Sequence, residues 1–308
     1  MNNRLYFIII SIPLILILTS FIGRIFALRI LRPVIDITKT AEAITHEGLD
    51  SRVKSEHLDV EMRFLVSAFN DMISRLDKSF KYIMEFSSNV AHELKTPIAI
   101  IRGETELALR KDYSNEEYKR VIKICLDESK RILKTIEDLL LLTKLDFRPE
   151  FFNFEKIDLV PFIYEIYEQT KLLSLKKKIG VSIDLPEKPV FINADKLHLR
   201  RLFFNLISNS IKFNHKEGSI SFLLSVEGGN AKIEISDTGI GISKEDLPKI
   251  FDRFFHKDTL EGNNSPGNGL GLAIAMAIAK MHNGDIKAYS EYGKGSKFSV
   301  ILPVREKH

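Results

Sequence analysis

The stretch NVAHELKTPIAI, residues 89–100, places a histidine and then a proline in an otherwise continuous helical pattern. The seam positions leading through it step by three and four residues, as in a coiled coil: Leu76, Phe80, Ile83, Ser87, Val90 and Leu94. His92 lies two residues from each of the last two seam positions, so at about 100° per residue it points away from the seam. Pro97 has no N–H and crowds the carbonyl of Glu93, which predicts a bend in the helix beside His92.

The pair His92 and Glu93 is a candidate reactive site. A neutral imidazole is a good nucleophile, and an adjacent carboxylate can orient it and take its proton. Taken alone, a surface histidine beside a glutamate is usually only part of a solvated helix face. The attached motif LKTP, residues 94–97, favours the chemical interpretation.

Composition limits the classes to which the chain can belong. Its 308 residues are enough for two or more domains, and its formal net charge of +4 is too small to indicate nucleic-acid binding. The single cysteine, Cys125, excludes a disulfide framework and a thiolate metal cluster. We expect Cys125 to pack within a helix as a small apolar residue.

The N-terminal segment LYFIIISIPLILILTSFI, residues 5–22, contains no charged side chain. Extended past Arg24, it predicts a membrane-spanning helix over residues 5–28. A cleaved signal peptide is the alternative, but the apolar run is long for one and no small-x-small cleavage site follows it. Basic residues follow at positions 24, 29, 32 and 39. The positive-inside rule therefore predicts a single-pass protein of the cytoplasmic membrane, with its C-terminal bulk in the cytoplasm.

Two short helices are expected between residues 29 and 79. Coiled-coil spacing recurs in both, at Val34, Ile37, Ala41 and Ile44 and at Met62, Leu65, Phe69, Met72 and Leu76. The segment HEGLDSRV, residues 46–53, breaks the pattern and is predicted to be a connector between the two helices. Two consecutive steps of four follow, ending at Phe80, and they insert a stutter where two helical registers can compete.

A helical hairpin is predicted over residues 80–147. Ser114 and Glu117 form an S-x-x-E capping box that starts its second helix. The apolar stripe of that helix comprises Val121, Ile124, Ile132, Leu139 and Leu142. Two such helices in each chain bury both of their faces when two chains pair. We therefore expect a homodimer built as a four-helix bundle.

Residues 155–305 show mixed strand and helix patterns, which indicate an α/β domain. One expected helix carries Asn205, Asn209 and Lys212 on one face, where amide oxygens suit Mg²⁺ and the ammonium group suits phosphate. Taken alone, such a stripe is usually an exposed helix face.

Two glycine segments favour the interpretation of that stripe as part of a phosphate-binding site. DTGIGI, residues 237–242, ends a strand, and PGNGLGL, residues 266–272, opens a helix. Glycines let backbone N–H groups approach phosphate, and a helix N-terminus favours the anion. Turn glycines are the common alternative, and no Walker loop is present. The order of asparagine helix and glycine segments along the chain nevertheless indicates a nucleotide site.

Residues 86–100, FSSNVAHELKTPIAI, resemble the phosphoacceptor box of bacterial two-component sensor histidine kinases. By this resemblance His92 receives the γ-phosphoryl group of ATP, Glu93 is the general base, and Thr96 helps to orient water when the enzyme dephosphorylates its partner. The two seams after the apolar segment, with Pro33 and Glu61 at the helix starts, resemble a HAMP signalling module, which is a parallel dimeric four-helix bundle.

The C-terminal half resembles the ATP-binding domain shared by histidine kinases, Hsp90 chaperones, DNA gyrase and mismatch-repair ATPases, a two-layer α/β sandwich. The resemblance implies that Asp237 accepts a hydrogen bond from the adenine amino group and that Asn209 ligates Mg²⁺, with Asn205 nearby. Lys212 would meet phosphate, and Phe213 would flank the adenine. The other residues implied at the nucleotide are Gly239, Gly241, Arg253, Lys257, Gly267, Gly269, Leu270, Gly271 and Leu272.

One position departs from the family. His256 stands where the family often has an arginine, and a neutral imidazole would hold a γ-phosphate poorly, so Lys257 is the expected substitute. His198 and His282 have no metal-like spacing and are predicted to be structural or surface residues.

The expected protein is multidomain: a transmembrane helix (5–28), an all-α coiled-coil HAMP linker (29–79), a dimerisation and histidine phosphotransfer hairpin (80–147) and an α/β two-layer ATP-binding domain (155–305). The resemblance implies autophosphorylation on His92 from ATP with Mg²⁺. It also implies transfer to an aspartate in the receiver domain of a response regulator, and phosphatase activity as well.

Two alternatives are kept open. One is a conformational ATPase of the gyrase or chaperone type, which has no use for the HELKTP box. The other is a phosphatase-dominant signalling scaffold. Relatives usually have two membrane spans around an external sensor, whereas four residues precede the span here. We therefore expect either a truncated start or a signal received through the membrane or a partner protein.

Overall fold

The structure, a computed structural model, describes residues 2–43, 52–53, 60–147, 152–256 and 268–304. The chain divides into two compact units, Met1–Ser88 and Asn89–His308.

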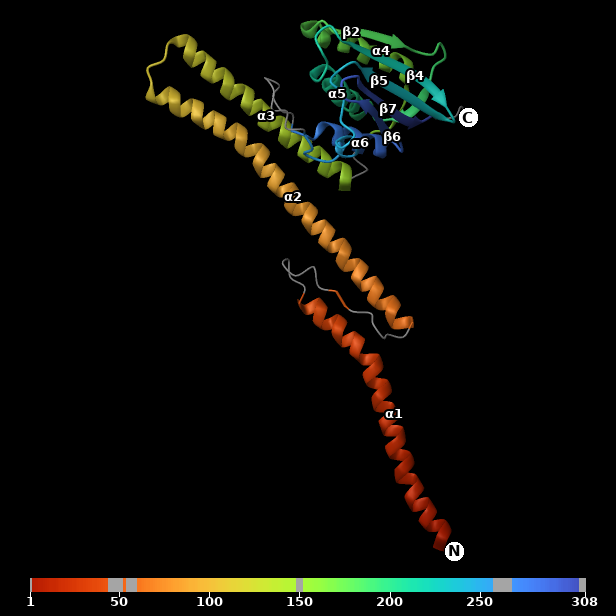
Figure 1. Ribbon diagram of the computed structural model, residues 1–308. Helices are drawn as coiled ribbons and strands as arrows, with labels where there is room; N and C mark the ends of the chain where they lie inside the picture. Colours follow the sequence, from red (N-terminus) through yellow and green to blue (C-terminus); the bar gives the residue numbers. More distant parts are fainter. Residues whose placement is uncertain (1, 44–51, 54–59, 148–151, 257–267, 305–308) are drawn as a thin grey trace. The chain divides into compact units, whose positions relative to one another are not determined.

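The first unit contains helix α1 (Asn2–Ala43) and the beginning of α2 (Val60–Arg110), drawn in red and orange in Figure 1. Among the described residues, none of the helices combines the length and the apolar content of a membrane span. This finding differs from the span predicted for residues 5–28.

Asn70, in the third turn of α2, holds Val53 at both of its backbone polar groups. The side-chain amide of Asn70 accepts from the backbone N–H of Val53 at 3.1 Å and donates to its carbonyl at 3.0 Å. Val53 is buried, as are Val66 and Ile73 on the same side of α2. The predicted seam lies one position away, and its exposed members are Leu65, Met72 and Leu76. The buried stripe of α2 is therefore distinct from the predicted seam, which is exposed at these three positions.

In the second unit, α2 and α3 (Asn115–Phe147) form the predicted hairpin. The capping box is confirmed: the Ser114 N–H donates to the Glu117 carboxylate at 2.7 Å, and the Glu117 N–H donates to Ser114 Oγ at 3.3 Å. This reciprocal cap satisfies two backbone donors that a helix start otherwise leaves without partners. Helix α2 passes through Pro97 without interruption.

An α/β domain completes the second unit. Its α-helices are α4 (Leu159–Ser174), α5 (Lys196–Lys212) and α6 (Gly271–Met281), and short 3₁₀ turns lie at Leu175–Lys177 and Leu247–Lys249. The strands are β1 (Glu155–Asp158), β2 (Gly180–Asp184), β3 (Phe191–Ala194), β4 (Ser219–Glu227), β5 (Asn230–Asp237), β6 (Asp285–Glu291) and β7 (Gly295–Pro303).

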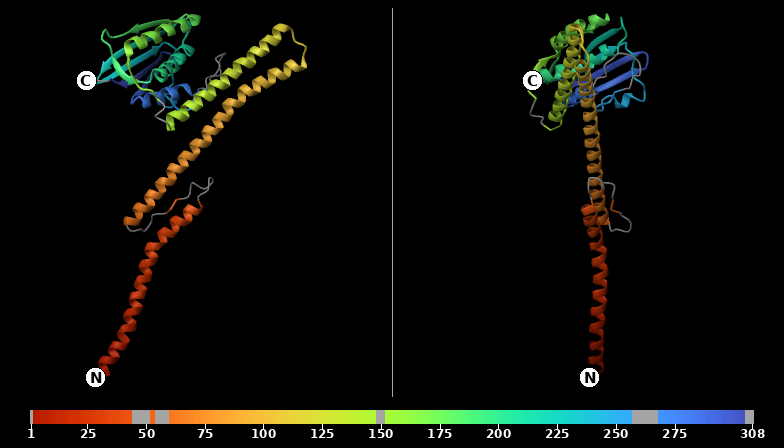
Figure 2. Two further views of the ribbon diagram at one scale, coloured as in Figure 1. Left: turned by 180° about the vertical axis from the view of Figure 1, so that it is seen from behind. Right: turned by 90° about the vertical axis from the view of Figure 1, so that its left-hand side faces the viewer.

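The strands form a five-stranded sheet in the order β2-β4-β5-β7-β6 and a separate antiparallel pair of β1 and β3. Strands β2 and β4 are parallel, and the other neighbours in the large sheet are antiparallel. Helices α4, α5 and α6 pack against this sheet and form the second layer of the domain, which Figure 2 shows from two further directions. The α/β part of the predicted fold is therefore confirmed.

Helix α5 joins the core to the candidate site. Its fully buried side chains form one stripe, at Leu199, Leu202, Phe203, Leu206 and Ile207. Each such residue stabilises the fold by roughly 1.5–3 kcal/mol relative to exposure. This burial sets the rotation of α5, and the stripe of Asn205, Asn209 and Lys212 falls beside the core rather than in it.

His282, at the end of α6, is a buried structural histidine, only 2% exposed. Its Nδ1 lies 2.8 Å from the Ile278 carbonyl, which can only accept, so Nδ1 carries the proton. Its Nε2 then accepts from the backbone N–H of Asp195 at 3.0 Å. Burial lowers the pKa of His282, although the Asp195 carboxylate acts in the opposite direction. The fold therefore requires the neutral ring.

We expect His282 to make the fold less stable in mild acid. Its pKa is lower in the folded than in the unfolded chain, so below about pH 6.5 the unfolded chain binds the additional proton. The free energy of unfolding should fall as the pH drops from about 7.5 to about 5.5, as measured by urea denaturation at both values. His282→Gln should flatten this pH dependence, whereas exposed His215→Gln should leave it unchanged. Equal slopes for all three proteins would contradict this role.

Candidate active site

The phosphoacceptor box presents His92 on the exposed surface of α2. The hydroxyl of Thr96 donates to the His92 carbonyl at 3.3 Å, so Thr96 lies one turn further along the same helix. The adjacent Glu93 side chain is only 10% exposed, because it faces α3. The imidazole is thus accessible to another molecule, while its neighbouring carboxylate is shielded.

Glu93 has a partner that the sequence did not reveal. The Arg131 guanidinium on α3 lies 3.9 Å from the Glu93 carboxylate and 4.0 Å from that of Glu128. Glu93 and Arg131 are about equally far from the turn between Arg110 and Ser114. In an antiparallel hairpin, residues equally far from the turn lie side by side, so this equal separation could have predicted the pair.

Asn205 points toward the start of α6. A methyl group placed on Gly271 would lie 3.7 Å from its side-chain oxygen. The Asn205 Nδ2 is buried and has no hydrogen-bond partner among the described residues. A buried donor without a partner is costly, and a phosphate oxygen would satisfy it. Asn209 lies one turn further along, half-buried.

Lys212 ends the asparagine stripe. Its Nζ lies 5.1 Å from the centroid of the Phe213 ring, which is 38% exposed. Burial lowers the pKa of Lys212, and the nearby charges of Arg131 and Lys134 on α3 lower it further. Like charges gathered in this way favour an anion between them. The end of α5 is therefore suited to phosphate.

The end of α5 is also fixed by a residue that the sequence analysis missed. Lys177 Nζ donates to the carbonyls of Ile211 and Lys212 at 2.9 and 2.7 Å. A cation at a helix C-terminus satisfies carbonyls that have no partner within the helix.

Asp237 ends β5 and is held by three donors. Its Oδ1 accepts from the backbone N–H groups of Gly239 at 3.0 Å and Ser296 at 3.2 Å, and its Oδ2 accepts from Ser210 Oγ at 3.0 Å. Burial raises the pKa of Asp237 above its usual range, although these hydrogen bonds oppose the shift. The three donors therefore hold the carboxylate in one position.

The first glycine segment is shaped by close backbone approach. A methyl group on Gly239 would lie 2.5 Å from the Phe213 carbonyl oxygen, and one on Gly241 would collide with the Glu291 carbonyl. Gly241 also has φ +68°, a left-handed conformation that favours glycine. Gly239 therefore brings the Asp237 loop against the end of α5, and Gly241 brings it against the end of β6.

In the second glycine segment, Gly269 has φ +63° and a methyl group on it would lie 2.5 Å from the Phe254 backbone. Leu270 is buried, and Gly271 and Leu272 begin α6, whose N-terminus is a suitable place for an anion. The predicted residues Gly267 and Lys257 lie outside the described residues.

The phenylalanine-rich segment IFDRFF, residues 250–255, precedes the second glycine segment. Arg253 is half-buried there, and the exposed His256 donates through Nδ1 to the Phe254 carbonyl at 2.9 Å. Because Nδ1 of His256 is used in this hydrogen bond, Nε2 is the other ring nitrogen that a ligand could contact. The structure thus brings the asparagine stripe, Asp237 and both glycine segments around one region, bounded by α5, the end of β5 and the start of α6.

Metal binding at this site would need an amide oxygen and a nucleotide. Among the described residues, no group of three or more His, Cys, Asp or Glu side chains could hold a metal ion. Mg²⁺, however, is commonly held by one or two protein oxygens together with substrate phosphates. The amide oxygen of the half-buried Asn209 fits a metal that arrives with its nucleotide.

An accessible histidine on a helical hairpin, together with amide, ammonium and glycine groups suited to phosphate in the same unit, is the arrangement of a phosphoryl-transfer protein. Three protein families match the chain: the HAMP domain over residues 25–78, the His Kinase A (phospho-acceptor) domain over 83–148, and the histidine kinase-, DNA gyrase B- and HSP90-like ATPase over 194–306. The chain belongs to the two-component sensor histidine kinases.

Individual proteins agree with this family. The signal transduction histidine-protein kinase ArlS of Staphylococcus aureus strain USA300 is 32% identical over 292 residues, which is 93% of this chain and 63% of ArlS. The chain thus spans less than two thirds of the length of the curated relatives that it matches. ArlS from strain COL matches equally well.

Solved structures show the same fold. The histidine kinase AdeS of Acinetobacter baumannii aligns with a TM-score of 0.55 at 24% identity, covering 70% of this chain and 98% of AdeS. The histidine kinase ThkA, solved in complex with the response regulator protein TrrA, aligns with a TM-score of 0.60 at 22% identity. That match covers 74% of this chain and 64% of ThkA.

Proposed function

We propose that the protein phosphorylates itself on His92 from ATP and passes the phosphoryl group to an aspartate in the receiver domain of a response regulator. The observation that carries this proposal is the position of Arg131. It contacts Glu93, beside His92, and its charge acts on Lys212 at the end of the asparagine stripe. The phosphate end of the pocket therefore faces the part of α3 that lies opposite the phosphoacceptor turn.

Each residue has a role in this proposal. Asp237 accepts from the adenine amino group, and Phe213 lies against the base. Asn205 and Lys212 hold phosphate oxygens, and Glu93 accepts the proton of the His92 imidazole. Asn209 would ligate Mg²⁺, which when bound neutralises charge on the transferring phosphoryl group. Catalysis by this chain then consists mainly of positioning and of electrostatic stabilisation.

The function is tested with γ-labelled ATP and Mg²⁺ on the whole chain in detergent. We expect label on the protein that is labile in acid and stable in alkali, as a phosphohistidine is. Label should then leave the protein when a receiver domain is added. ATP binding without any label would contradict the kinase function and favour the conformational ATPase.

Phosphatase activity is a second candidate function, and the exposed Thr96 favours it. Its hydroxyl lies one turn from His92, where it can orient a water toward a bound phosphoaspartate. Thr96→Ala should slow dephosphorylation of a receiver domain while autophosphorylation continues. Equal dephosphorylation by both proteins would remove Thr96 from this role.

We also propose that the protein is a homodimer. Helix α3 exposes apolar side chains with coiled-coil spacing, at Ile122, Leu126, Leu133, Ile136 and Leu140. Such a stripe is unfavourable in water and would be buried in a four-helix bundle of two hairpins. Sedimentation should therefore give twice the chain mass, and a monomer at micromolar concentration would contradict the bundle.

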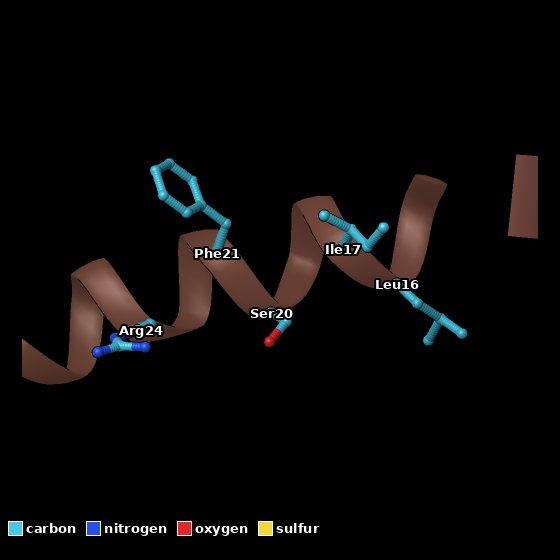
Figure 3. A pocket seen from close by; sticks show the side chains of 5 residues that line it. All are labelled: Leu16, Ile17, Ser20, Phe21 and Arg24. Carbon is cyan, nitrogen blue, oxygen red and sulfur yellow. The ribbon is translucent and has the colours of Figure 1, made fainter. Parts of the chain in front are cut away.

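Helix α1 is proposed to attach the protein to the cytoplasmic membrane through residues 5–28, with the kinase domains in the cytoplasm. Residues 5–22 are uncharged, and the apolar side chains described between Ile12 and Ile25 are largely exposed. The five side chains drawn in Figure 3 all come from this one helix and form an open surface.

The membrane proposal is tested by flotation with lipid vesicles. The whole chain should float with the vesicles, and a chain that begins at Arg29 should remain in solution. Recovery of the whole chain in the soluble fraction would contradict the attachment.

A further inference from the structure

Asp138 on α3 is a buried carboxylate with no role in the site described above. The residue is 4% exposed. One of its oxygens accepts from the Arg201 guanidinium on α5, and the other accepts from Asn268 Nδ2 at 2.8 Å. Burying a carboxylate is costly unless donors and an opposite charge compensate. Here the compensation comes from two separate elements of the ATP-binding domain.

Both partners of Asp138 belong to elements that carry residues proposed to hold the nucleotide. Arg201 lies one helical turn before Asn205, on the same face of α5. Asn268 lies in the second glycine segment, and its Oδ1 accepts from the Leu270 N–H at 3.3 Å, at the start of α6. A single side chain of the hairpin thus fixes the asparagine helix and the glycine segment together. Packing of α3 against α6 continues this contact.

A second contact of α3, made by Arg131, indicates how α5 is oriented along α3. Arg131 lies two helical turns before Asp138, roughly 10 Å along α3, and it contacts Glu93. Lys212 lies three turns after Arg201, roughly 16 Å along α5. With Arg201 held at Asp138, the later turns of α5 extend toward the level of Arg131. The phosphate end of the pocket is thereby directed to the turn that carries His92.

We propose that Asp138 is a positioning residue for the phosphoryl transfer: it aligns the nucleotide pocket with the His92 turn through Arg201 and Asn268. The inference rests on the proposed kinase function. Asp138 touches neither nucleotide nor imidazole, so its loss should leave ATP binding intact and misdirect the bound nucleotide. A displacement of about 1 Å in such a site can reduce the rate about 100-fold.

The test measures binding and transfer separately in the whole chain. For Asp138→Ala we expect autophosphorylation at saturating ATP to slow by about 10- to 100-fold. The Kd for ATP, from titration calorimetry, should change by less than about threefold. Arg201→Ala should give a similar loss, and the double variant should be no slower than Asp138→Ala, because both changes remove one contact. Asp138→Asn, which retains an acceptor of the same shape, should be intermediate.

Glu137→Ala is the matched control, since Glu137 is an exposed carboxylate on the same turn of α3, and it should behave as wild type. Wild-type or faster transfer by both Asp138→Ala and Arg201→Ala would overturn the proposal, as would additive losses in the double variant. An ATP Kd raised more than about tenfold in both variants would show a merely structural role and also overturn it. Absence of label on wild type would instead remove the kinase function itself.

Discussion

His92→Gln should reduce autophosphorylation to background, at least about 1,000-fold below wild type. Glutamine has a similar size and a good helix propensity, but its amide is not a nucleophile at neutral pH. His92 is exposed on α2, outside the packed core and outside the nucleotide pocket, so the fold and ATP binding should remain. The measurement is the rate of label incorporation from γ-labelled ATP, with ATP affinity determined in parallel.

A matched control keeps this result specific. Arg102→Gln introduces the same side chain on the same helix, and it removes only an exposed pair with Glu106. Such pairs contribute little to stability. It should label as wild type does. Acid-labile label that persists on His92→Gln would place the phosphoacceptor elsewhere and contradict the assignment of the box.

Asp237→Asn should weaken ATP binding by about 100-fold. The amide oxygen can accept from Gly239 and Ser296, and the amide nitrogen can donate to Ser210, so the loop should keep its structure. The nitrogen then presents a donor where a base amino group also donates. An unpaired buried donor costs about 1–3 kcal/mol, and about 1.4 kcal/mol is tenfold in affinity.

Inosine triphosphate makes this test selective. Its base carries a carbonyl where adenine carries the amino group, so the amide introduced by Asp237→Asn can donate to it. We expect wild type to prefer ATP and the variant to lose or reverse that preference, as measured by calorimetric titration with both nucleotides. Exposed Asp252→Asn is the control. An unchanged preference for ATP in Asp237→Asn would remove Asp237 from base recognition.

The same carboxylate predicts a pH dependence. Burial raises the pKa of Asp237, so this group takes up a proton at a higher pH than an exposed aspartate does. The protonated form loses charge and acceptor capacity. ATP affinity of wild type should therefore fall as the pH is lowered toward that pKa, and this acidic loss should be absent in Asp237→Asn.

Local features of the fold were predictable because they depend on neighbours in the chain. Ser114 and Glu117 cap α3 through bonds that span three positions. Strands β4 and β5 lie in the region where the sequence shows strand patterns, and every second residue is buried over Ile220–Leu224 and Ala231–Ile235. The stripe of Asn205, Asn209 and Lys212 followed from helical periodicity. Period and capping are properties of a few consecutive residues, so one sequence is enough to find them.

Contacts between distant segments were not predictable in the same way. Asp138 is bonded to residues 63 and 130 positions away, and the Asp195 N–H meets the His282 ring across 87 positions. The absence of metal-like spacing left His282 either structural or on the surface, and the structure shows that it is buried. No pattern in the chain marks which carboxylate will meet which donor, because the packing of α3 on the ATP-binding domain decides it.

The amino-acid sequence alone showed the order of the asparagine helix and the glycine segments, and its resemblance to sensor histidine kinases predicted the class of protein and the phosphoacceptor box. Three further facts emerge only from the packed chain: Glu93 is paired with Arg131, the Asp237 carboxylate is held by three donors, and Asp138 accepts from both Arg201 on α5 and Asn268 in the second glycine segment. These facts depend on burial and on distances between elements. Both are set when helices and sheet pack together, and neither is a property of any single segment.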